Sequence, residues 1–405
     1  PDNSRYFHDL GALAQDGRCK SFDAAADGYV RSEGVGMVVL KPLSAARRDG
    51  DRVLALIRGS ATNQDGRSNG LTSPNGWAQE EVLKQALRAA GLEARKVGYV
   101  EAHGAGTRLG DPIELRALDA VLGPGHSPES PLRIGSIKTN LGHTEAAAGV
   151  AGLIKVILVL QHGLIPASLN LHTPTPLAPW ERLQVPVEPT PWPGRSLPRV
   201  AGVSAFGLAG TNVHVLLEEA PPEPPELPPA QESRQAGPHL LPLSARSPQA
   251  LVDLAGRYHR WLERNPEADL ADICHTAARG RDHHPHRLAL VVGDRRQLLA
   301  DLAAIRLESG ASGSPPDHLQ QRATYLQQQL PRAEDRRQIL EALGALYRDG
   351  AELDWEALAP RGRRIPLPTY PWQRSRHWFA PSIPDEVLFH EVRWDPLESP
   401  SGEGM

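Results

Sequence analysis

Two histidine-bearing segments, each following a short apolar run, constrain this chain more than any other feature. Residues 101–107 read Glu-Ala-His-Gly-Ala-Gly-Thr and follow the run 98–100, and residues 138–143 read Lys-Thr-Asn-Leu-Gly-His and follow the run 132–137. An apolar run that ends in a glycine-rich turn with polar side chains is typical of a strand end that carries a site. The two segments therefore predict one pocket with two imidazoles and a nearby ammonium.

Short apolar runs alternate with helical stretches throughout residues 1–220. The apolar runs occupy 36–40, 53–57 and 213–217, and the helical stretches occupy 77–90, 112–121 and 144–162. Strands that alternate with helices in this way indicate an α/β sandwich. The stretch 144–162 is rich in alanine, glycine and valine and carries few charges, so we expect a fully buried helix there.

A proline-rich segment at 221–239 predicts a linker between domains, because its repeated Pro-Pro pairs favour an extended, semi-rigid chain. We expect a small α/β domain at 240–308. Its helix is predicted to begin at Ser247-Pro248 and to run to about Arg264, and a strand at 287–292 and a helix near 295–307 are predicted to follow.

The C-terminal part of the sequence is less regular. Three segments are expected there: a flexible seam with helices at 309–349, an extended strap at 350–379, and the start of a following region or a tail at 380–405. The seam itself is the Ser/Gly-rich stretch 309–316, and the helices are expected near 317–330 and 333–348. Residues 365–379 of the strap carry too many prolines for a helix and are expected to lay four aromatic side chains on another domain's surface: Tyr370, Trp372, Trp378 and Phe379.

The composition argues against several classes of protein. A net charge of −4, from 44 Lys+Arg against 48 Asp+Glu, is unlike a nucleic-acid-binding surface, which needs a clustered basic excess. The two cysteines, Cys19 and Cys274, are far apart in the sequence and share no spacing rule with the histidines, so neither a disulfide framework nor a cysteine zinc site is expected. No apolar window is expected to be long enough for a membrane span, and no signal peptide is recognised, so we expect a cytoplasmic protein. Because the sequence begins at Pro1 without a methionine, we also expect it to be a piece of a longer protein.

Several motifs in a fixed order resemble the ketosynthase (beta-ketoacyl synthase) domain of modular type I polyketide synthases. Besides the two histidine segments, they are Asp-Gly-Arg-Cys-Lys at 16–20, Phe-Asp-Ala-Ala-Ala-Asp-Gly-Tyr-Val-Arg at 22–31, Glu-Gly-Val-Gly at 33–36, Asn-Gln-Asp-Gly-Arg-Ser-Asn-Gly-Leu-Thr at 63–72, Gly-Asp-Pro-Ile-Glu at 110–114 and Phe-Gly-Leu-Ala-Gly-Thr-Asn at 206–212. The match is nearly continuous from about residue 4 to 220. The resemblance implies the thiolase fold, a five-layered α-β-α-β-α sandwich, of which residues 1–220 would be the C-terminal part.

The resemblance continues beyond the ketosynthase and also reveals two departures. Residues 240–308 resemble the small α/β linker domain that follows such ketosynthases, and residues 350–379 resemble the strap that follows the acyltransferase. The family's nucleophilic cysteine is expected in a segment N-terminal to Pro1, so no nucleophile is assigned in this chain. The acyltransferase expected between the linker domain and the strap is absent, which implies a separate acyltransferase as a partner.

The resemblance also assigns roles to the residues of the predicted pocket. His103 and His143 would be neutral imidazole donors that stabilise the enolate formed when a malonyl-type thioester loses carbon dioxide. The ammonium of Lys138 would disfavour protonation of both imidazoles. The alternatives are two structural turn histidines and a surface lysine.

Two further segments are expected to contact the substrate. The backbone N–H of Leu208, in the loop with Phe206 and Gly207, would complete an oxyanion hole for the acyl thioester. Thr107 would bind the pantetheine arm of the carrier, and Ala105, which lacks the hydroxyl usual at its position, would weaken that binding by about 1 kcal/mol. The alternatives are a tight turn under Phe206 and a threonine that caps a turn.

Other candidate groups are rejected at this level. Cys19 stands in a loop rather than at a helix N-terminus and is not expected to be a nucleophile. His214 lies in an apolar strand and is expected to be a core residue. Residues 125–129 lack the final glycine of a Gly-x-Ser-x-Gly elbow. No metal site is expected at the histidine cluster, which has no carboxylate or cysteine at ligand spacing: His283, His284 and His286.

Two functions of different classes follow. In the first, the intact protein is a condensing transferase that joins carrier-bound acyl and malonyl-type thioesters by decarboxylative Claisen condensation. Its partners would be an acyl carrier protein with phosphopantetheine, the remaining part of the synthase and a second copy in a homodimer. No metal or soluble cofactor is implied, and the chain alone is predicted to be inactive. In the second, the chain is a non-catalytic remnant or scaffold that docks carrier proteins and neighbouring modules. A thiolase-type degradative enzyme is disfavoured, because no second cysteine stands in a matching motif.

Overall fold

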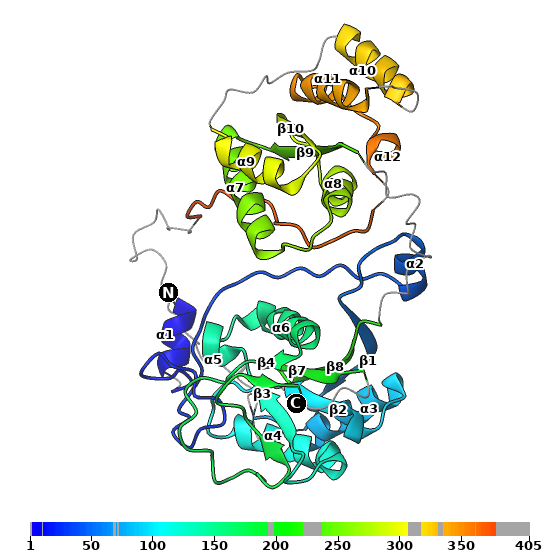
Figure 1. Ribbon diagram of the computed structural model, residues 1–405. Coiled ribbons are helices and arrows are strands. Elements are labelled where there is room, and N and C mark those ends of the chain that lie inside the picture. The colour runs from blue at the N-terminus through cyan, green and yellow to red at the C-terminus, as the bar shows by residue number, and fades with distance from the viewer. Residues whose placement is uncertain are drawn as a thin grey trace, which may run out of the picture. The chain divides into compact units, whose positions relative to one another are not determined.

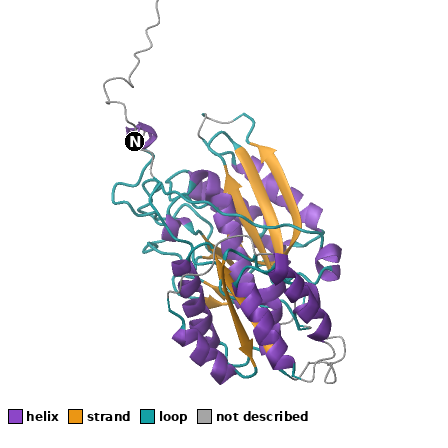
Figure 2. Cartoon of the chain, turned by 90° about the horizontal axis from the view of Figure 1, so that it is seen from above, coloured by secondary structure: helices purple, strands orange, loops and turns teal. Residues whose placement is uncertain are grey.

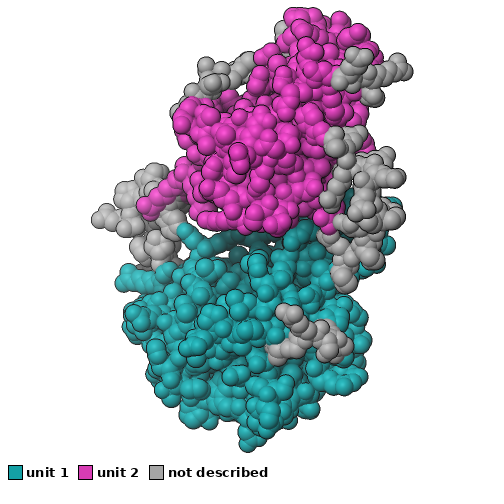
Figure 3. Space-filling model, viewed as in Figure 1, with its two compact units in different colours: residues 1–232 teal, residues 233–405 magenta. Residues whose placement is uncertain are grey.

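The computed structural model describes residues 2–9, 11–67, 70, 73–192, 198–221, 237–306, 317–330, 335–360 and 362–377. The chain divides into two units, residues 1–232 and 233–405 (Figure 3). Most of the proline-rich segment expected at 221–239 lies outside the described residues, and so do the predicted seam at 309–316 and the whole of 380–405.

A six-stranded mixed sheet is the centre of the first unit (Figure 1), with the strand order β1-β8-β7-β2-β3-β5. Its strands are β1 (Ala55–Gln64), β2 (Val97–Glu101), β3 (Leu132–Gly135), β5 (Leu183–Gln184), β7 (Val200–Phe206) and β8 (Thr211–Glu219). β8 pairs antiparallel with both β1 and β7, whereas β7, β2, β3 and β5 pair parallel to one another. A small separate ribbon joins β4 (Leu164–Ile165) to β6 (Thr190–Pro191).

Helices cover both faces of this sheet: α3 (Gly76–Ala90) and α4 (Gly110–Val121) lie on one face and α6 (Ala148–His162) on the other. The first unit also contains α1 (Asp2–Asp9), α2 (Leu43–Arg48) and α5 (Lys138–Leu141), with the 3-10 turns η1 (Ala94–Lys96), η2 (Gly123–Gly125) and η3 (Glu145–Ala147). Successive residues of a strand point to opposite faces, and so Leu216 packs with α3 and α4 while Leu217 packs with α6. The first unit is therefore an α-β-α sandwich, and the predicted α/β sandwich is confirmed.

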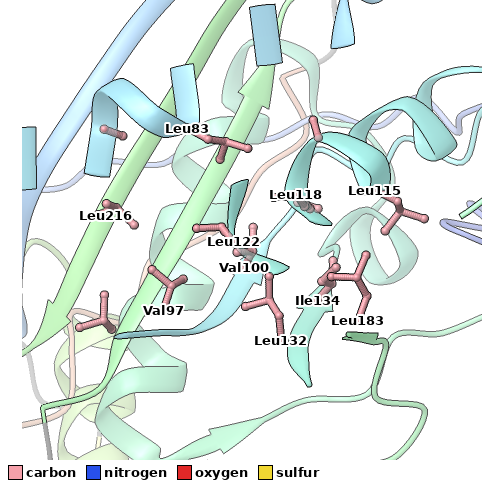
Figure 4. Packing of buried hydrophobic residues seen from close by; sticks show 14 of the residues in the cluster. Leu83, Val97, Val100, Leu115, Leu118, Leu122, Leu132, Ile134, Leu183 and Leu216 are labelled. Carbon is pink, nitrogen blue, oxygen red and sulfur yellow. The ribbon is translucent and has the colours of Figure 1, made fainter. Parts of the chain in front are cut away.

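The core on the α3 and α4 side is built almost entirely from aliphatic side chains (Figure 4). Leu83 of α3 and Leu118 of α4 pack against Val100 and Ile134, and all four are essentially inaccessible to solvent. Asn75 begins α3 by accepting the N–H groups of Trp77 and Ala78 on its side chain. The sequence thus positions this layer directly behind the strand ends of β2 and β3.

The helix α6 departs from the prediction of a fully buried helix. It buries only the face that carries Gly152, Lys155, Val156, Val159 and Leu160, and this face packs on β7 and β8. Leu158 on another face is 48% exposed. The stretch Glu145–His162 is also long and apolar enough in composition to cross a membrane, which corrects the expectation that no window qualifies. Its contacts with the sheet are those of a core helix.

The apolar run at 36–40 is a second departure, because it pairs with no strand among the described residues. It belongs to a long segment that leads to α2 (Figure 1), in which Val35, Met37 and Val39 are 92%, 89% and 96% exposed. A Cβ at Gly36 would lie 2.8 Å from Val150 Cγ1 of α6, so the glycine side of the segment faces this helix. An apolar run of this kind is typical of a buried strand with neighbours on both edges.

The second unit is built on β9 (His239–Ala245), which pairs antiparallel with β10 (His286–Val292). Its helices are α7 (Pro248–Arg264), α8 (Leu270–Arg279), α9 (Arg295–Ala304), α10 (Asp317–Gln329), α11 (Arg336–Arg348) and α12 (Trp355–Leu358). Ser247 caps α7 by accepting the N–H of Ala250, and Pro248 occupies the first turn, which confirms the predicted helix start. Figure 2 distinguishes the helices, in purple, from the strands, in orange.

The predicted strap at 350–379 is only partly extended, because it contains the short helix α12 at Trp355–Leu358. The segment 362–377 carries no helix or strand, as its prolines predicted. The Tyr370 hydroxyl accepts the N–H of Arg246 at 3.0 Å, and its ring lies edge-on to His284. Tyr370 therefore lies against residues of the predicted 240–308 domain, while Trp372 is 72% exposed. Trp378 and Phe379 lie outside the described residues.

Gly59 provides a test of the packing of α3 on β1. A Cβ at this position would lie 2.5 Å from the main-chain nitrogen of Ala90, and a main-chain atom cannot rotate away. We expect G59A to lower the free energy of unfolding by about 1–3 kcal/mol, measured by urea denaturation. The matched control is G149A, whose added Cβ would lie at an ordinary 3.5 Å from Ala205 Cβ. Equal stability of G59A and the parent chain would contradict this packing.

Candidate active site

The ends of three neighbouring parallel strands bring the predicted site residues together. His103 follows β2, Lys138 begins α5 shortly after β3, and Phe206 is the last residue of β7. Because β7, β2 and β3 run parallel side by side, their carboxyl ends meet at one edge of the sheet. His143 follows α5 after one residue. The second histidine segment thus contains a helical turn, where the sequence pattern had suggested only a glycine-bracketed turn.

The two histidine rings are neighbours within a row of aromatic rings. The ring centroids of His103 and His143 are 5.3 Å apart, at an interplanar angle of 77°. Phe206 lies 5.6 Å from His103, and Tyr29 lies 5.4 Å from His143. Together with Phe7, these rings line a cavity of about 620 Å³.

Main-chain hydrogen bonds determine the tautomer of both imidazoles. The N–H of Phe206 donates to Nδ1 of His103 at 3.2 Å, and the N–H of Glu145 donates to Nδ1 of His143 at 2.9 Å. A neutral imidazole that accepts on Nδ1 carries its proton on Nε2. Both rings are therefore Nε2–H donors when neutral.

The environment keeps the two imidazoles neutral. Burial lowers the pKa of His103 well below its ordinary value, and the neighbouring Lys138 ammonium and His143 lower it further. Burial, followed by the Lys138 ammonium, lowers the pKa of His143 to about 4, against the opposing effect of Glu145. At neutral pH the pocket therefore presents two uncharged N–H donors.

Lys138 lies beneath the turn that carries His103. Its side chain is nearly inaccessible to solvent, and its ammonium donates to the main-chain carbonyl of His103 at 2.5 Å. Burial lowers the pKa of Lys138, while the carboxylates of Glu101, Glu114 and Asp111 act in the opposite direction. This placement brings a positive charge behind the imidazoles and is incompatible with a surface lysine.

Two buried carboxylates of α4 hold the first histidine segment in place. Glu114 accepts the N–H groups of His103 and Gly104, both at 2.8 Å, and Asp111 accepts that of Gly106 at 3.1 Å. Burial raises the pKa of Glu114 to about 7 and that of Asp111 to about 6. The sequence analysis did not assign these two a role in the site. Their spacing of three residues places both carboxylates on one face of α4, and this pattern could have indicated that they act together on the histidine segment.

The remaining predicted substrate residues lie around the same cavity. Thr107, Gly207 and Leu208 line it, as does Ala105. The Thr107 hydroxyl accepts the N–H of Gly110 at 3.1 Å, so it has the turn-capping role that the sequence left as an alternative. Leu208 is 60% exposed in a loop closed by the bond from the Gly207 N–H to the Thr211 carbonyl.

The groups rejected from the sequence do not line this cavity. Cys19 is buried with its Sγ 3.4 Å from the Ala105 carbonyl oxygen, and burial raises the pKa of its thiol. His214 is buried on β8, bonded to Ser204 at 3.0 Å, and burial lowers its pKa to about 3. His283 stacks on Trp355 and is hydrogen-bonded to Tyr347. Within the part of the chain that the structure describes, no three potential metal ligands gather.

Sequence models of two domains of one enzyme family match the first unit. They are the beta-ketoacyl synthase N-terminal domain, at residues 1–46, and the beta-ketoacyl synthase C-terminal domain, at residues 54–172. A model described as CurL-like, PKS C-terminal, matches residues 239–302.

Solved structures extend this match over nearly the whole chain. A ketosynthase from module 6 of the bacillaene synthase of Bacillus subtilis aligns with a TM-score of 0.81 and 33% identity, over 94% of this chain and 67% of that chain. The chain belongs to the ketosynthase family. An oxazolomycin ketosynthase domain of Streptomyces albus aligns with a TM-score of 0.76 and 34% identity, over 93% of this chain and 63% of that one. The predicted thiolase-like fold of a ketosynthase is thereby confirmed.

The ketosynthase chain also matches much longer polyketide synthases. It is 50% identical over 313 residues, or 76% of its length, to a phenolphthiocerol/phthiocerol polyketide synthase of Mycobacterium tuberculosis. It is 51% identical over 301 residues, or 74% of its length, to the erythronolide synthase of Saccharopolyspora erythraea. The chain spans only 16% and 9% of the lengths of these two relatives.

The K138M variant tests the electrostatic role of the buried lysine in this ketosynthase. Because the ammonium opposes protonation of both imidazoles, its loss is expected to raise the pKa of His143 from about 4. An NMR titration of histidine-labelled protein measures this pKa, and H143N identifies the signal.

The same titration has a consequence for stability. Since the folded-state pKa of His143 lies below the unfolded value of about 6.5, the unfolded chain binds more protons and stability is lost as the pH falls through this window. K138M should lose less of its stability there than the parent chain. An unchanged pKa of His143 in K138M would contradict the assigned role.

Proposed function

We propose that this chain contributes the two-histidine part of a beta-ketoacyl synthase site that carries out decarboxylative Claisen condensation. The single observation that supports this most strongly is the pair of neutral Nε2–H donors, on imidazole rings whose centroids are 5.3 Å apart, at the edge of one cavity. An enolate oxygen accepts two hydrogen bonds, so two uncharged donors match it better than one imidazolium. Family membership supports a condensing transferase as the reaction class.

In the proposed reaction, a malonyl-type thioester loses carbon dioxide, and the electron pair of the broken C–C bond becomes an enolate on the thioester. His103 and His143 donate to the enolate oxygen, where the negative charge develops. The carbanion then attacks the carbonyl carbon of an acyl thioester, a new C–C bond forms, and the thiolate that held the acyl group leaves. No proton needs to pass through Lys138, whose charge serves to keep the donors neutral.

The loop at the end of β7 is proposed to serve the second step. The backbone N–H of Leu208 would stabilise the oxyanion formed when the acyl thioester is attacked, and Phe206 and Gly207 would shape that part of the cavity. Thr107 would contact the pantetheine arm of an acyl carrier protein. Ala105 offers no hydroxyl there, which weakens the contact by about 1 kcal/mol.

The nucleophilic cysteine is proposed to come from another portion of the synthase. Of the two cysteines of this chain, both are buried, and burial raises the pKa of each thiol, so neither suits the role. The uncovered apolar side chains of Val35, Met37 and Val39 support a neighbouring segment that packs on this region. We further propose a cytoplasmic homodimer that is supplied with extender units by a separate acyltransferase.

The deciding experiment supplies the missing portion in trans. We expect no condensation product from the chain alone. Mixed with a polypeptide that carries the cysteine-bearing portion of a related ketosynthase, it should form a β-ketoacyl thioester detectable by mass spectrometry. H103A and H143A should each lower the rate by about 10²- to 10³-fold, the usual effect of losing one oxyanion donor.

The exposed His162 at the end of α6 offers the matched control, and H162A should keep the full rate. A histidine variant that reacts as fast as H162A would exclude the proposed mechanism. Condensation by the isolated chain would exclude the proposed origin of the nucleophile. Binding of the carrier protein without any condensation in the mixture would favour the scaffold.

A further inference from the structure

A buried ion pair joins the end of β2 to α6 and has no part in the proposed chemistry. Lys155 Nζ lies 2.7 Å from Glu101 Oε2, and the two side chains are only 8% and 2% exposed. The Tyr99 hydroxyl donates to the same oxygen at 2.7 Å. The free energy lost when two charges are removed from water often exceeds the free energy gained from their attraction. A buried ion pair is therefore weak evidence of a stabilising role.

Glu101 connects this pair to the active-site turn. It is the last residue of β2, two residues before His103, and its second oxygen, Oε1, accepts the N–H of Ile137 at 2.5 Å. Ile137 immediately precedes Lys138. The carboxylate of Glu101 therefore holds both the end of β2 and the beginning of α5, which are the two segments that carry His103 and Lys138.

The hydrogen-bond partner of Lys138 is unusual for an ammonium that has buried carboxylates nearby. Three buried carboxylates act on its ammonium electrostatically, those of Glu101, Glu114 and Asp111. Among the described residues its hydrogen bond nevertheless goes to an uncharged group, the main-chain carbonyl of His103. Glu114 is occupied by the N–H groups of His103 and Gly104, and Glu101 is occupied by Tyr99, Ile137 and Lys155.

We propose that Lys155 is a positioning residue of the site: its ammonium occupies Glu101 and thereby keeps Lys138 on the carbonyl of His103. Without Lys155, Glu101 would be a buried carboxylate with no cation of its own, and Lys138, at the start of the segment that Glu101 already holds, would pair with it. The ammonium would then leave its place behind the imidazoles. This last consequence rests on the proposed function, but the placement of Lys138 does not.

The titratable groups that interact electrostatically with Lys138 come from several elements. They are Glu101 on β2, Asp111 and Glu114 on α4, Cys19 in the segment between α1 and α2, His103 after β2, and His143 after α5. Lys155 is the only cation of α6 within the buried face of that helix in the described structure. Substitutions that remove the charge of Glu101 or Lys155 therefore test this pair while the other charged neighbours of Lys138 stay in place.

The lysine content of the chain makes a direct test possible. There are six lysines, at positions 20, 41, 84, 96, 138 and 155, so labelling of the lysine side chains gives a spectrum in which each ammonium is resolved. We would titrate the full chain by NMR, assign Lys138 with K138M, and compare the pKa of Lys138 in the parent, K155M, E101Q and the double variant E101Q/K155M.

The proposal predicts changes of opposite sign. In K155M the pKa of Lys138 should rise by about one unit or more, because it gains a carboxylate partner. In E101Q it should fall below that of the parent chain, because a negative neighbour is lost. In E101Q/K155M it should return close to the parent value, and K155R should leave it unchanged.

The matched control is K84M, which removes a half-buried lysine paired with Glu80 and Glu81 on α3 and should leave the pKa of Lys138 unaltered. If K155M does not fold, K155Q, which keeps a polar group beside Glu101, replaces it and should raise the pKa of Lys138 in the same direction. A pKa of Lys138 that is the same in all folded variants, with only the melting temperature changed, would overturn the proposal in favour of a purely structural ion pair. The outcome does not depend on condensing activity, so it is independent of the test of the proposed function.

Discussion

The hydrogen bonds that the main chain donates to Nδ1 of His103 and His143 determine what this site can do. They leave each neutral ring with its proton on Nε2. The two main-chain N–H groups that donate to Nδ1 belong to Phe206, at the end of β7, and to Glu145, in the turn after His143. Burial and the ammonium of Lys138 then prevent protonation of the rings. The remaining features, from the carboxylates under the turn to the row of aromatic rings, hold these two donors at one edge of the sheet.

The site was predictable because its residues stand at strand ends. The apolar runs before His103 and Lys138 predicted β2 and the strand before α5, and parallel strands bring their carboxyl ends to one edge. Asp111 and Glu114 were harder to recognise, since the sequence does not say which face of α4 turns toward the histidine segment. A carboxylate on a helix usually faces water, and only the packing of α4 reveals that both are buried.

The fold was less predictable where the burial of a segment depends on contacts with distant parts of the chain. The composition of α6 and of the run 36–40 correctly indicates apolar surfaces, but it does not say what covers them. The described residues cover only one face of α6 and leave Val35, Met37 and Val39 largely exposed. The local sequence pattern indicates which face of a helix or strand is apolar. The number of layers of helices and sheets that cover such faces depends on the whole folded protein. Both departures are therefore consistent with the proposed neighbouring portion of the synthase.

The central claim is that the pocket presents two neutral Nε2–H imidazoles, and the most direct measurement is of their tautomers. Nitrogen-15 NMR of histidine-labelled protein at neutral pH distinguishes a protonated from an unprotonated ring nitrogen, and H103N and H143N identify the signals. The account predicts an unprotonated Nδ1 and a protonated Nε2 for both His103 and His143. An imidazolium, or a proton on Nδ1 in either ring, would contradict it.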